Sequence, residues 1–372
     1  MEESQSAQEL GMKQHDKWMK WVDLPSDIDY IPAAAASHHH LHIVNYKNGY
    51  NIYESDLNTD IWQEIITSDQ FPEGLDLSDN QMAYNRSTNT FCSRVRSGID
   101  DYLNSENNTS QNATFIFINM TSKTMHTKSF SELPDNDIKF NFCAILRMNE
   151  EIHIIGGRHN SKHLVWNIAT NSEEEIYDFA KVGQFKEGLM GPNAIYVPSK
   201  DVIILIGGRG SKANGIWIFS MKSKKWAKMD ALSFIHWNVS LTLTSNEEYV
   251  VIAGGYGVGG SINSTDKIFV LDIRDDNEYK LSESKIKCPS KGLCHIVAVG
   301  GLKDEYLVRG WLKEICKDLN LEILPMDVIS MIMNWYSQEE IHWLPRMTDS
   351  MYNTANGNHF AISVKSILDT LL

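Results

Sequence analysis

The sequence lacks the segments that would direct a protein into or across a membrane. No unbroken apolar run of about eighteen residues or more occurs in its 372 residues, so no membrane-spanning helix is predicted. The first residues, MEESQSAQELGMKQHDKW, are polar and contain no apolar core of a signal peptide. Cysteines are few and lack CxxC spacing, so we expect free thiols in the reducing cytoplasm; the five are Cys92, Cys143, Cys288, Cys294 and Cys316.

Basic residues are fewer than acidic ones. Lys and Arg number 34 against 48 Asp and Glu, which gives a formal net charge of −14. A protein that binds nucleic acid nonspecifically, or that binds an anionic membrane surface, normally presents a basic face. The composition therefore predicts neither kind of partner.

Motifs of the common catalytic classes are missing as well. The sequence contains no G-x-S-x-G nucleophile elbow and no H-E-x-x-H zinc helix. The glycine-rich stretch from Gly254 to Gly260 leads into an expected strand at residues 267–273, whereas a phosphate-binding loop needs a helix there. We therefore expect no enzymatic activity and no cofactor.

One stretch, residues 201–230, has the pattern of a small antiparallel sheet. An unbroken apolar run from Val202 to Ile206 is long enough for a buried strand. The doublet Gly207-Gly208 ends this run, and a polar loop follows it. A further strand is expected at residues 216–221, and the next begins at Trp226.

The same pattern recurs along the chain. Apolar runs end in glycine doublets at Gly157, Gly208 and Gly255, which are 51 and 47 residues apart. Degenerate copies of the glycine position occur near residues 45, 95 and 310. A period near fifty residues with four strands in each unit is typical of propeller blades.

The glycine doublets, each followed by an aromatic residue and then a Trp, as in Phe219 to Trp226, resemble kelch repeats. The resemblance covers about residues 30–310 and implies an all-β fold, a six-bladed kelch-type β-propeller. We expect a flexible N-terminal tail at residues 1–15 and a single propeller domain at residues 16–372.

The pattern changes to a helical period after Gly310. Apolar residues at helical spacing and a Pro at position 325 predict an inserted α-helical hairpin at residues 311–344. This hairpin is similar to an element that accompanies kelch repeats in some expanded protist families. We expect it between the second and third strands of the last blade, with residues 358–368 as the third strand. A strand at residues 16–25 would complete that blade and close the ring.

A run of histidines near the N-terminus is the most metal-like string in the sequence. On a strand, His38, His40 and His42 would share one face. No cysteine or carboxylate lies close by in the sequence to complete a zinc site. We therefore predict a solvated or pore-facing strand and no bound metal.

The residues that follow the glycine positions are the candidate binding residues. They lie on loops between second and third strands, which should cluster on one face of the ring; the set is Arg158, His159, Arg209, Lys212, Tyr256 and Trp311. Arginine beside aromatic residues is typical of interaction hot spots, and two arginines could hold an acidic segment of a protein partner. Alternatively, each arginine pairs with an aspartate on the next blade.

We therefore predict a non-enzymatic protein–protein interaction module, a scaffold or adaptor, for which a cytoskeletal partner is possible. A second hypothesis is a substrate adaptor of a ubiquitin ligase, in which residues 324–337 recruit the ligase; they resemble the opening helix of an F-box. A propeller enzyme is the third hypothesis, because catalytic groups can converge from distant loops.

Overall fold

The computed structural model describes residues 19–25, 28, 30–36, 40–46, 49–56, 61–71, 75–76, 82–85, 88–97, 113–130, 144–148, 150–158, 162–170, 172–178, 188–189, 191–208, 215–229, 237–257, 265–276, 278–289, 294–299, 340–345, 358–363 and 370–371. Nearly all of them lie in strands or in the turns between strands. The only helices among them are the short 3-10 helices η1 (Ser68–Gln70) and η2 (Pro198–Lys200). Within this part of the chain, no helix has the length and hydropathy needed to span a bilayer.

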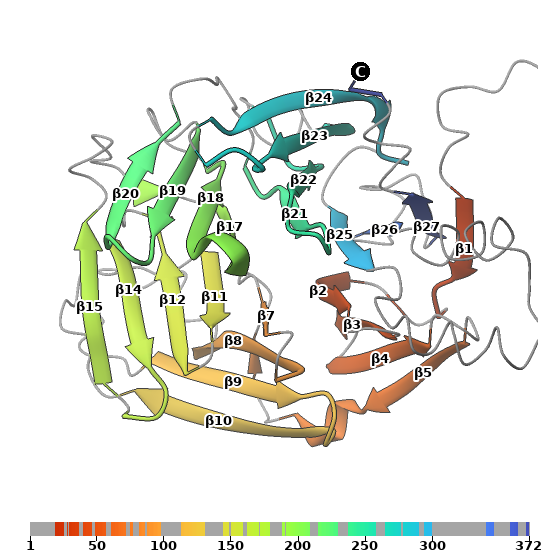
Figure 1. Cartoon of the computed structure of the whole chain (residues 1–372). Coiled ribbons are helices and arrows are strands. Elements are labelled where there is room, and N and C mark those ends of the chain that lie inside the picture. Colours follow the sequence, from red (N-terminus) through yellow and green to blue (C-terminus); the bar gives the residue numbers. More distant parts are fainter. Residues whose placement is uncertain are drawn as a thin grey trace, which may run out of the picture.

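The strands form antiparallel sheets around a common centre, so the chain folds as a β-propeller (Figure 1). Five sheets have four strands each. They consist of β2 (Tyr30–Ala36), β3 (His40–Tyr46), β4 (Tyr50–Asp56) and β5 (Ile61–Ile66); of β11 (Ala144–Met148), β12 (Glu151–Ile155), β14 (Lys162–Asn167) and β15 (Ser172–Asp178); of β17 (Asn193–Val197), β18 (Val202–Ile206), β19 (Ile216–Ser220) and β20 (Lys225–Lys228); of β21 (Ser240–Leu243), β22 (Tyr249–Ala253), β23 (Lys267–Asp272) and β24 (Lys280–Lys287); and of β25 (Cys294–Val299), β26 (Glu340–Pro345), β27 (Asn358–Ser363) and β1 (Met19–Asp23).

The prediction of a six-bladed propeller is wrong, because the structure has five four-stranded blades. Two further sheets are present. One has two strands, β13 (Gly157–Arg158) and β16 (Gly188–Leu189), and the other has five: β6 (Leu75–Asp76), β7 (Ala83–Asn85), β8 (Thr90–Ser97), β9 (Ala113–Asn119) and β10 (Thr124–Phe130). Both β6 and β7 pair with β8, with Leu75 opposite Ser97 and Ala83 opposite Cys92. The register changes between these two pairings, so a single straight strand could not make both.

The N-terminal strand and the last strand of the chain lie in one sheet. β1 pairs with β27, with Lys20 opposite Phe360, which is the pairing expected from the sequence. β27 in turn pairs with β26, and β26 with β25. The sheet that completes the ring therefore contains both the first and the last described strand, which leaves no gap in the circuit of sheets.

The predicted position of the helical insert is wrong. Residues 340–344 were assigned to the insert, but Glu340–Pro345 form β26, the second strand of its sheet. Residues 300–339 therefore connect the first and second strands, and not the second and third. The helical prediction for residues 311–339 lies outside the described residues, as do the predicted tail at residues 1–15 and the degenerate glycine position at 310.

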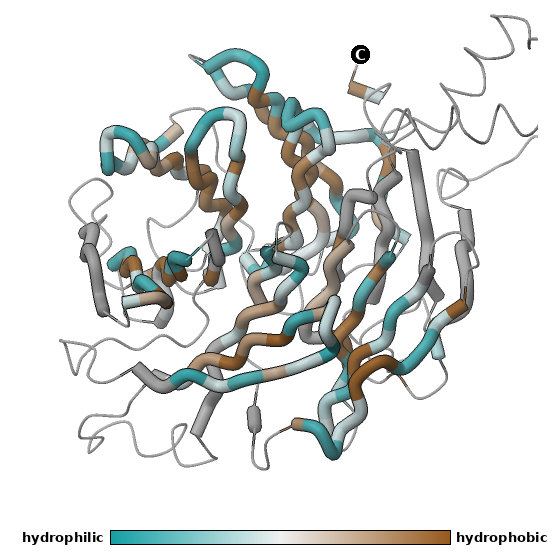
Figure 2. The backbone as a smooth tube through the Cα atoms, turned by 60° about the horizontal axis from the view of Figure 1, so that its bottom comes forward, coloured by the Kyte–Doolittle hydropathy of each residue, from teal (hydrophilic) through white to brown (hydrophobic). Residues whose placement is uncertain are grey.

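The hydrophobic core lies between neighbouring sheets rather than at one centre. One cluster joins Phe115 and Phe117 of β9 to Ile152 and Ile154 of β12. Strands β18 and β22 are buried on both faces and pack on one another through Ile204 and other aliphatic residues. This burial explains why their sequences are unbroken apolar runs instead of alternating ones. Figure 2 shows hydrophobic stretches along the strands and hydrophilic residues at the turns.

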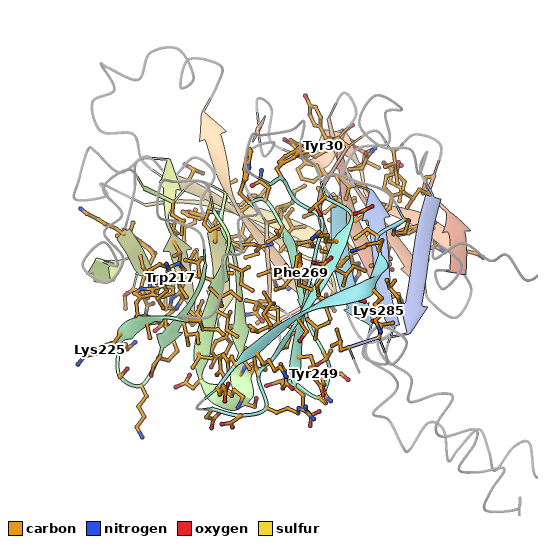
Figure 3. The ribbon with its side chains drawn as sticks, turned by 90° about the horizontal axis from the view of Figure 1, so that it is seen from above. Tyr30, Trp217, Lys225, Tyr249, Phe269 and Lys285 are labelled. Carbon is orange, nitrogen blue, oxygen red and sulfur yellow. The ribbon has the colours of Figure 1, made fainter. Side chains whose placement is uncertain are left out.

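The loops alternate between the two faces of the ring, because adjacent strands in each sheet are antiparallel. Loops between second and third strands, and connections into the next sheet, emerge on one face, here called the upper face. Loops between first and second strands and between third and fourth strands emerge on the lower face. In Figure 3, Tyr249 and Lys225 lie toward the lower face, and Tyr30, at the start of β2, lies toward the upper one.

Candidate functional site

The predicted binding residues belong to the upper face, where the second strands end in glycine doublets. Gly156 and Gly157 have φ values of 72° and 122°, and Gly254 and Gly255 have values of 65° and 90°. A Cβ atom on Gly255 would lie 2.8 Å from the Trp237 carbonyl oxygen, so only glycine fits there without moving the backbone. The doublets let the segments that enter each sheet pass directly over the ends of the second strands.

Leu189 lies at the junction of two sheets on this face. It belongs to β16 (Gly188–Leu189), which pairs with β13 (Gly157–Arg158) at the end of the preceding sheet. Its side chain also meets the next doublet, because a Cβ atom on Gly208 would lie 2.3 Å from the Leu189 Cδ1 atom. Leu189 is fully buried and therefore joins the β11–β15 and β17–β20 sheets at the upper face.

The next junction is made by Asn238. Its backbone N–H donates a hydrogen bond of 2.8 Å to the carbonyl oxygen of Gly191, which precedes β17. The Asn193 side-chain amide donates in turn to the carbonyl oxygen of Val239, at 2.9 Å. Asn238 has a φ of 53°, a conformation that Asn adopts more readily than most residues. These contacts hold the entry to β21 against the entry to β17.

An aromatic pair, Trp237 and Tyr256, lies beside this junction. Two backbone hydrogen bonds join the residues: Trp237 N–H donates to Tyr256 O at 3.0 Å, and Tyr256 N–H donates to Trp237 O at 2.9 Å. The two ring centroids are 5.0 Å apart with an interplanar angle of 45°. Both side chains are half-buried. The pair is therefore held in place by the backbone while part of each ring remains accessible.

We call this surface the glycine rim. It comprises Gly156, Gly157, Leu189, Gly191, Gly208, Trp237, Asn238, Gly255 and Tyr256. Three consecutive sheets contribute to it, and its backbone is fixed by contacts between them. A rigid frame that presents half-buried aromatic rings can bind a partner with little loss of conformational entropy.

The structure describes only part of the predicted binding set. Tyr256 is on the glycine rim, and the backbone of Arg158 ends β13 at the same rim, paired with Gly188. His159, Arg209 and Lys212 lie outside the described residues, as does the side chain of Arg158, so neither the binding role of the arginines nor their alternative pairing with aspartates is tested. Trp311 is also outside them, but its assignment to a loop between second and third strands is wrong, because residues 300–339 join β25 to β26.

Leu189, Trp237 and Asn238 were missed by the sequence reasoning. They lie on the segments that lead into β17 and β21, and these segments carry no repeated motif. The segment that leads into β21 did carry a usable signal. Its Trp237-Asn238 follows the end of β20 and precedes an alternating strand that begins at Ser240. Such a position is where a connection must cross from one sheet to the next.

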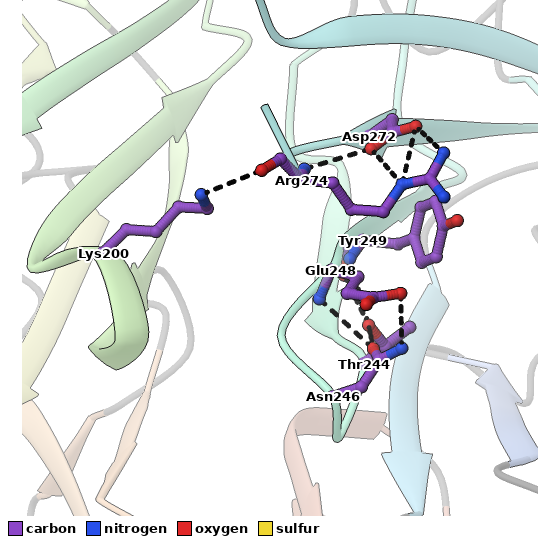
Figure 4. A network of polar contacts seen from close by, with 7 residues as sticks. All are labelled: Lys200, Thr244, Asn246, Glu248, Tyr249, Asp272 and Arg274. Carbon is purple, nitrogen blue, oxygen red and sulfur yellow. Dashed lines mark hydrogen bonds and ion pairs between the residues drawn. The ribbon is translucent and has the colours of Figure 1, made fainter. Parts of the chain in front are cut away.

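The lower face has a different character, because its turns are joined by polar contacts (Figure 4). Lys200 forms an ion pair with Asp276 across the gap between two sheets, and its ammonium also lies 3.5 Å from the Arg274 carbonyl oxygen. The Ser199 N–H donates to the Glu247 carboxylate at 2.7 Å. These contacts tie η2 to turns of the β21–β24 sheet.

Arg274 also forms its side-chain contacts within the lower face. Its Nη2 atom donates to Asp272 Oδ2 at 2.7 Å, and its guanidinium lies 5.1 Å from the centroid of the Tyr249 ring. The hydrogen bond from Arg274 holds the pKa of the Asp272 carboxyl below its usual range. Most charges described on this face of the two sheets therefore have partners within the protein, which makes it less suited to capturing another molecule.

The part of the histidine run that the structure describes, His40 to His42, is not a fully solvated strand. His40 and His42 both lie on β3 with their rings stacked at 6.1 Å, but His42 is only 1% exposed. Burial and, to a smaller extent, the neighbouring His40 together lower the pKa of His42 to about 4. The Glu54 carboxylate lies 3.5 Å from His42 Nδ1 and would favour the charged ring, but the burial effect is the larger one. His38 lies outside the described residues, among which no group of three or more His, Cys, Asp or Glu side chains is arranged to hold a metal ion.

No protein-family model matches the chain, and no curated protein shows significant similarity to it. The β-propeller arrangement is therefore shown by the structure alone. The resemblance to kelch repeats rests on the glycine doublets and on the apolar strands that precede them.

Proposed function

We propose that the protein is a kelch-type propeller that binds a protein partner at the glycine rim, as a non-enzymatic scaffold or adaptor. The observation that carries the proposal is the Trp237–Tyr256 pair, which is half-buried and fixed by reciprocal backbone hydrogen bonds. Rigid, partly exposed aromatic rings are the commonest anchors of protein interfaces. The loops that carry Arg158, Arg209 and Lys212 leave the sheets on the same face, which would suit an acidic segment of the partner.

The cytoplasm is the proposed location. Cys92 and Cys288 are buried thiols in the structure, which suits a protein that folds in a reducing compartment. The net charge of −14 is consistent with a protein partner rather than a nucleic acid or an anionic membrane.

The test compares capture by two tyrosine variants. Proximity labelling in the native cell, with the chain fused to a labelling enzyme, would first identify the neighbouring proteins. Tyr256→Ala should then lower affinity for the direct partner about tenfold or more, as expected for an aromatic hot spot. Tyr249→Ala is the matched control, because Tyr249 is also half-buried but lies on the lower face, under Arg274. Equal capture by wild type and Tyr256→Ala would count against the glycine rim.

The arginines are tested separately by charge reversal. Arg158→Glu combined with Arg209→Glu should abolish capture of a partner with an acidic segment while the melting temperature stays nearly unchanged. Lys222→Glu combined with Lys225→Glu is the control, because both lysines are exposed at the β19–β20 turn on the lower face. Retained capture by the arginine variant would remove these two residues from the proposal.

A ubiquitin-ligase substrate adaptor is a second candidate. The connection of residues 300–339 starts at the end of β25, on the lower face, whereas the glycine rim is on the upper face. An adaptor needs two binding elements that can be occupied together, and opposite faces meet this requirement. Deletion of residues 311–339 should abolish recovery of ligase subunits and leave partner capture intact if this candidate is correct. Stoichiometric copper, iron or zinc in the purified protein would instead favour the third candidate, a propeller enzyme.

A further inference from the structure

Two buried histidines face one another inside the β11–β15 sheet. His153 on β12 and His163 on β14 are both fully buried. His153 Nδ1 lies 2.9 Å from His163 Nε2, so the rings share a hydrogen bond. On its other side, His153 Nε2 lies 3.1 Å from the Oε2 atom of Glu151, which is half-buried. The three side chains form a continuous chain from the lower face into the interior of the protein.

The inner end of this chain lies against the next sheet. The His163 ring contacts Phe219 of β19 edge-on at 4.7 Å between centroids and Trp226 of β20 at 5.5 Å. Phe219 and Trp226 belong to the hydrophobic cluster between the two sheets. The charge of His163 therefore bears directly on an apolar interface.

The ionisable groups around the pair are few among the described residues. Glu151 lies on β12 itself, and Lys224 approaches from the β19–β20 turn. Tyr196 of β17 lies near Glu151 and hydrogen-bonds to Asp201. In β15, the register partner of His163 is Tyr177. Glu151 lies within hydrogen-bond distance of the pair, at its His153 end.

The donors and acceptors fix how many protons the pair can hold. The hydrogen bond from His153 lowers the pKa of Glu151, so this carboxylate accepts and His153 Nε2 must donate. In the neutral pair, His153 Nδ1 then accepts from His163 Nε2–H. One added proton on the His163 ring leaves this bond intact, because Nε2–H still donates. With a second proton, both facing nitrogens carry hydrogen, and the bond cannot exist.

We propose that the His153–His163 pair is a pH-sensitive latch between the β11–β15 and β17–β20 sheets, closed while the pair holds at most one added proton and opened by the second. Opening places two cations side by side within a buried region and moves the charged His163 ring away from Phe219 and Trp226. Burial and the nearby His153 hold the pKa of His163 well below its ordinary value of 6.5. The latch is therefore closed at neutral pH and opens only on acidification.

The first experiment is amide hydrogen exchange, corrected for the intrinsic effect of pH. In the wild-type protein, protection of peptides that cover β14 and β20 should fall by about tenfold or more as the pH is lowered stepwise from 7. His163→Gln can still donate to His153 Nδ1 but does not titrate, so its protection should change far less. His126→Gln is the matched control, because His126 is exposed on β10, and it should behave as the wild type does. Equal losses of protection in wild type and His163→Gln would overturn the proposal.

Glu151→Gln separates the latch from a simple packing role. Removal of the negative charge beside the pair makes the doubly protonated pair less favourable, so the loss of protection should shift to lower pH. A purely structural contact would weaken without this shift, and an unchanged transition pH would contradict the mechanism.

A direct readout remains if the substitutions prevent folding. In wild-type protein with 15N-labelled histidine, a scalar coupling between His153 Nδ1 and His163 Nε2 should be present at pH 7. It should disappear over the same pH interval as the hydrogen-exchange protection. Absence of the coupling at pH 7, or its persistence after protection is lost, would overturn the proposal.

Discussion

Acidification should destabilise the protein through His42, which lies on β3 between Ala35 of β2 and Glu54 of β4. The ring is 1% exposed, and its pKa in the folded protein is about 4. An unfolded histidine titrates near pH 6.5. The pKa of His42 is lower in the folded protein than in the unfolded chain. The neutral ring therefore makes its full contribution to stability above about pH 6.5. This contribution is lost as the pH falls from about 6.5 to about 4, where the unfolded chain binds the extra proton.

The magnitude follows from the two pKa values. Each tenfold difference in proton affinity is worth about 1.4 kcal/mol, so the full effect of His42 is about 3 kcal/mol. At pH 4.5 most of it, about 2 to 3 kcal/mol, should already be lost. His42→Gln removes this titration. Between pH 7.5 and pH 4.5, the free energy of unfolding of the variant should therefore fall by about 2 to 3 kcal/mol less than that of the wild type.

The assay is urea unfolding of both proteins at the two pH values, with His126→Gln as an exposed control that should follow the wild type. His163 is present in each protein, so its own titration contributes equally to all of them. If wild type and His42→Gln lose the same free energy on acidification, burial does not hold His42 neutral. The attraction of Glu54, at 3.5 Å, would then offset the effect of burial on the His42 pKa.

Three further substitutions test the packing of the ring. Gly255→Ala should lower the free energy of unfolding in urea by about 2 kcal/mol or more, because the residue has a φ of 90° and its Cβ atom would lie 2.8 Å from a backbone oxygen. An unchanged free energy of unfolding would contradict this close approach. Lys200→Met should cost about 1 kcal/mol or less, since Asp276 is 76% exposed, and the cost should vanish in 1 M salt; a salt-independent loss would show that packing and not charge is responsible. Ser284→Ala should cost about 1 to 2 kcal/mol, because the buried Ser284 Oγ accepts from Ile286 N–H and bonds to Thr370 Oγ1, and unchanged unfolding would mean that this contact contributes nothing.

Glycine doublets and apolar runs predicted the second strands well. β12, β18 and β22 lie where the sequence indicated, because strands buried on both faces must be continuously apolar and must end in glycine where another segment crosses them. The pairing of β1 with β27 was also predictable, since residues 358–368 repeat the pattern of β19. The sequence patterns behind both predictions lie within short windows of the chain, although the β1–β27 pairing itself joins distant segments.

The last sheet was harder to predict, because its second strand has no glycine doublet. β26 begins Glu340-Ile341-His342, and β12 begins Glu151-Ile152-His153. In both sheets the Glu is paired with the final residue of the first strand. This shared triplet was the available signal, and it would have placed residues 300–339 between the first and second strands.

The glycine rim was only partly accessible from sequence. The glycine doublets located it, but Leu189 and Asn238 acquire their roles through contacts between sheets that no spacing rule encodes. The His153–His163 pair was missed for a similar reason. The two residues are ten positions apart and meet only because β12 and β14 are adjacent, with Ile155 opposite His163.

The most direct test of the proposed binding face is site-specific photocrosslinking. A photoreactive phenylalanine analogue placed at Tyr256 should crosslink the partner, because this ring lies on the glycine rim beside Trp237. The same analogue at Tyr249, on the lower face, should not. Crosslinks from position 249 and none from position 256, with both proteins folded, would contradict binding at the glycine rim.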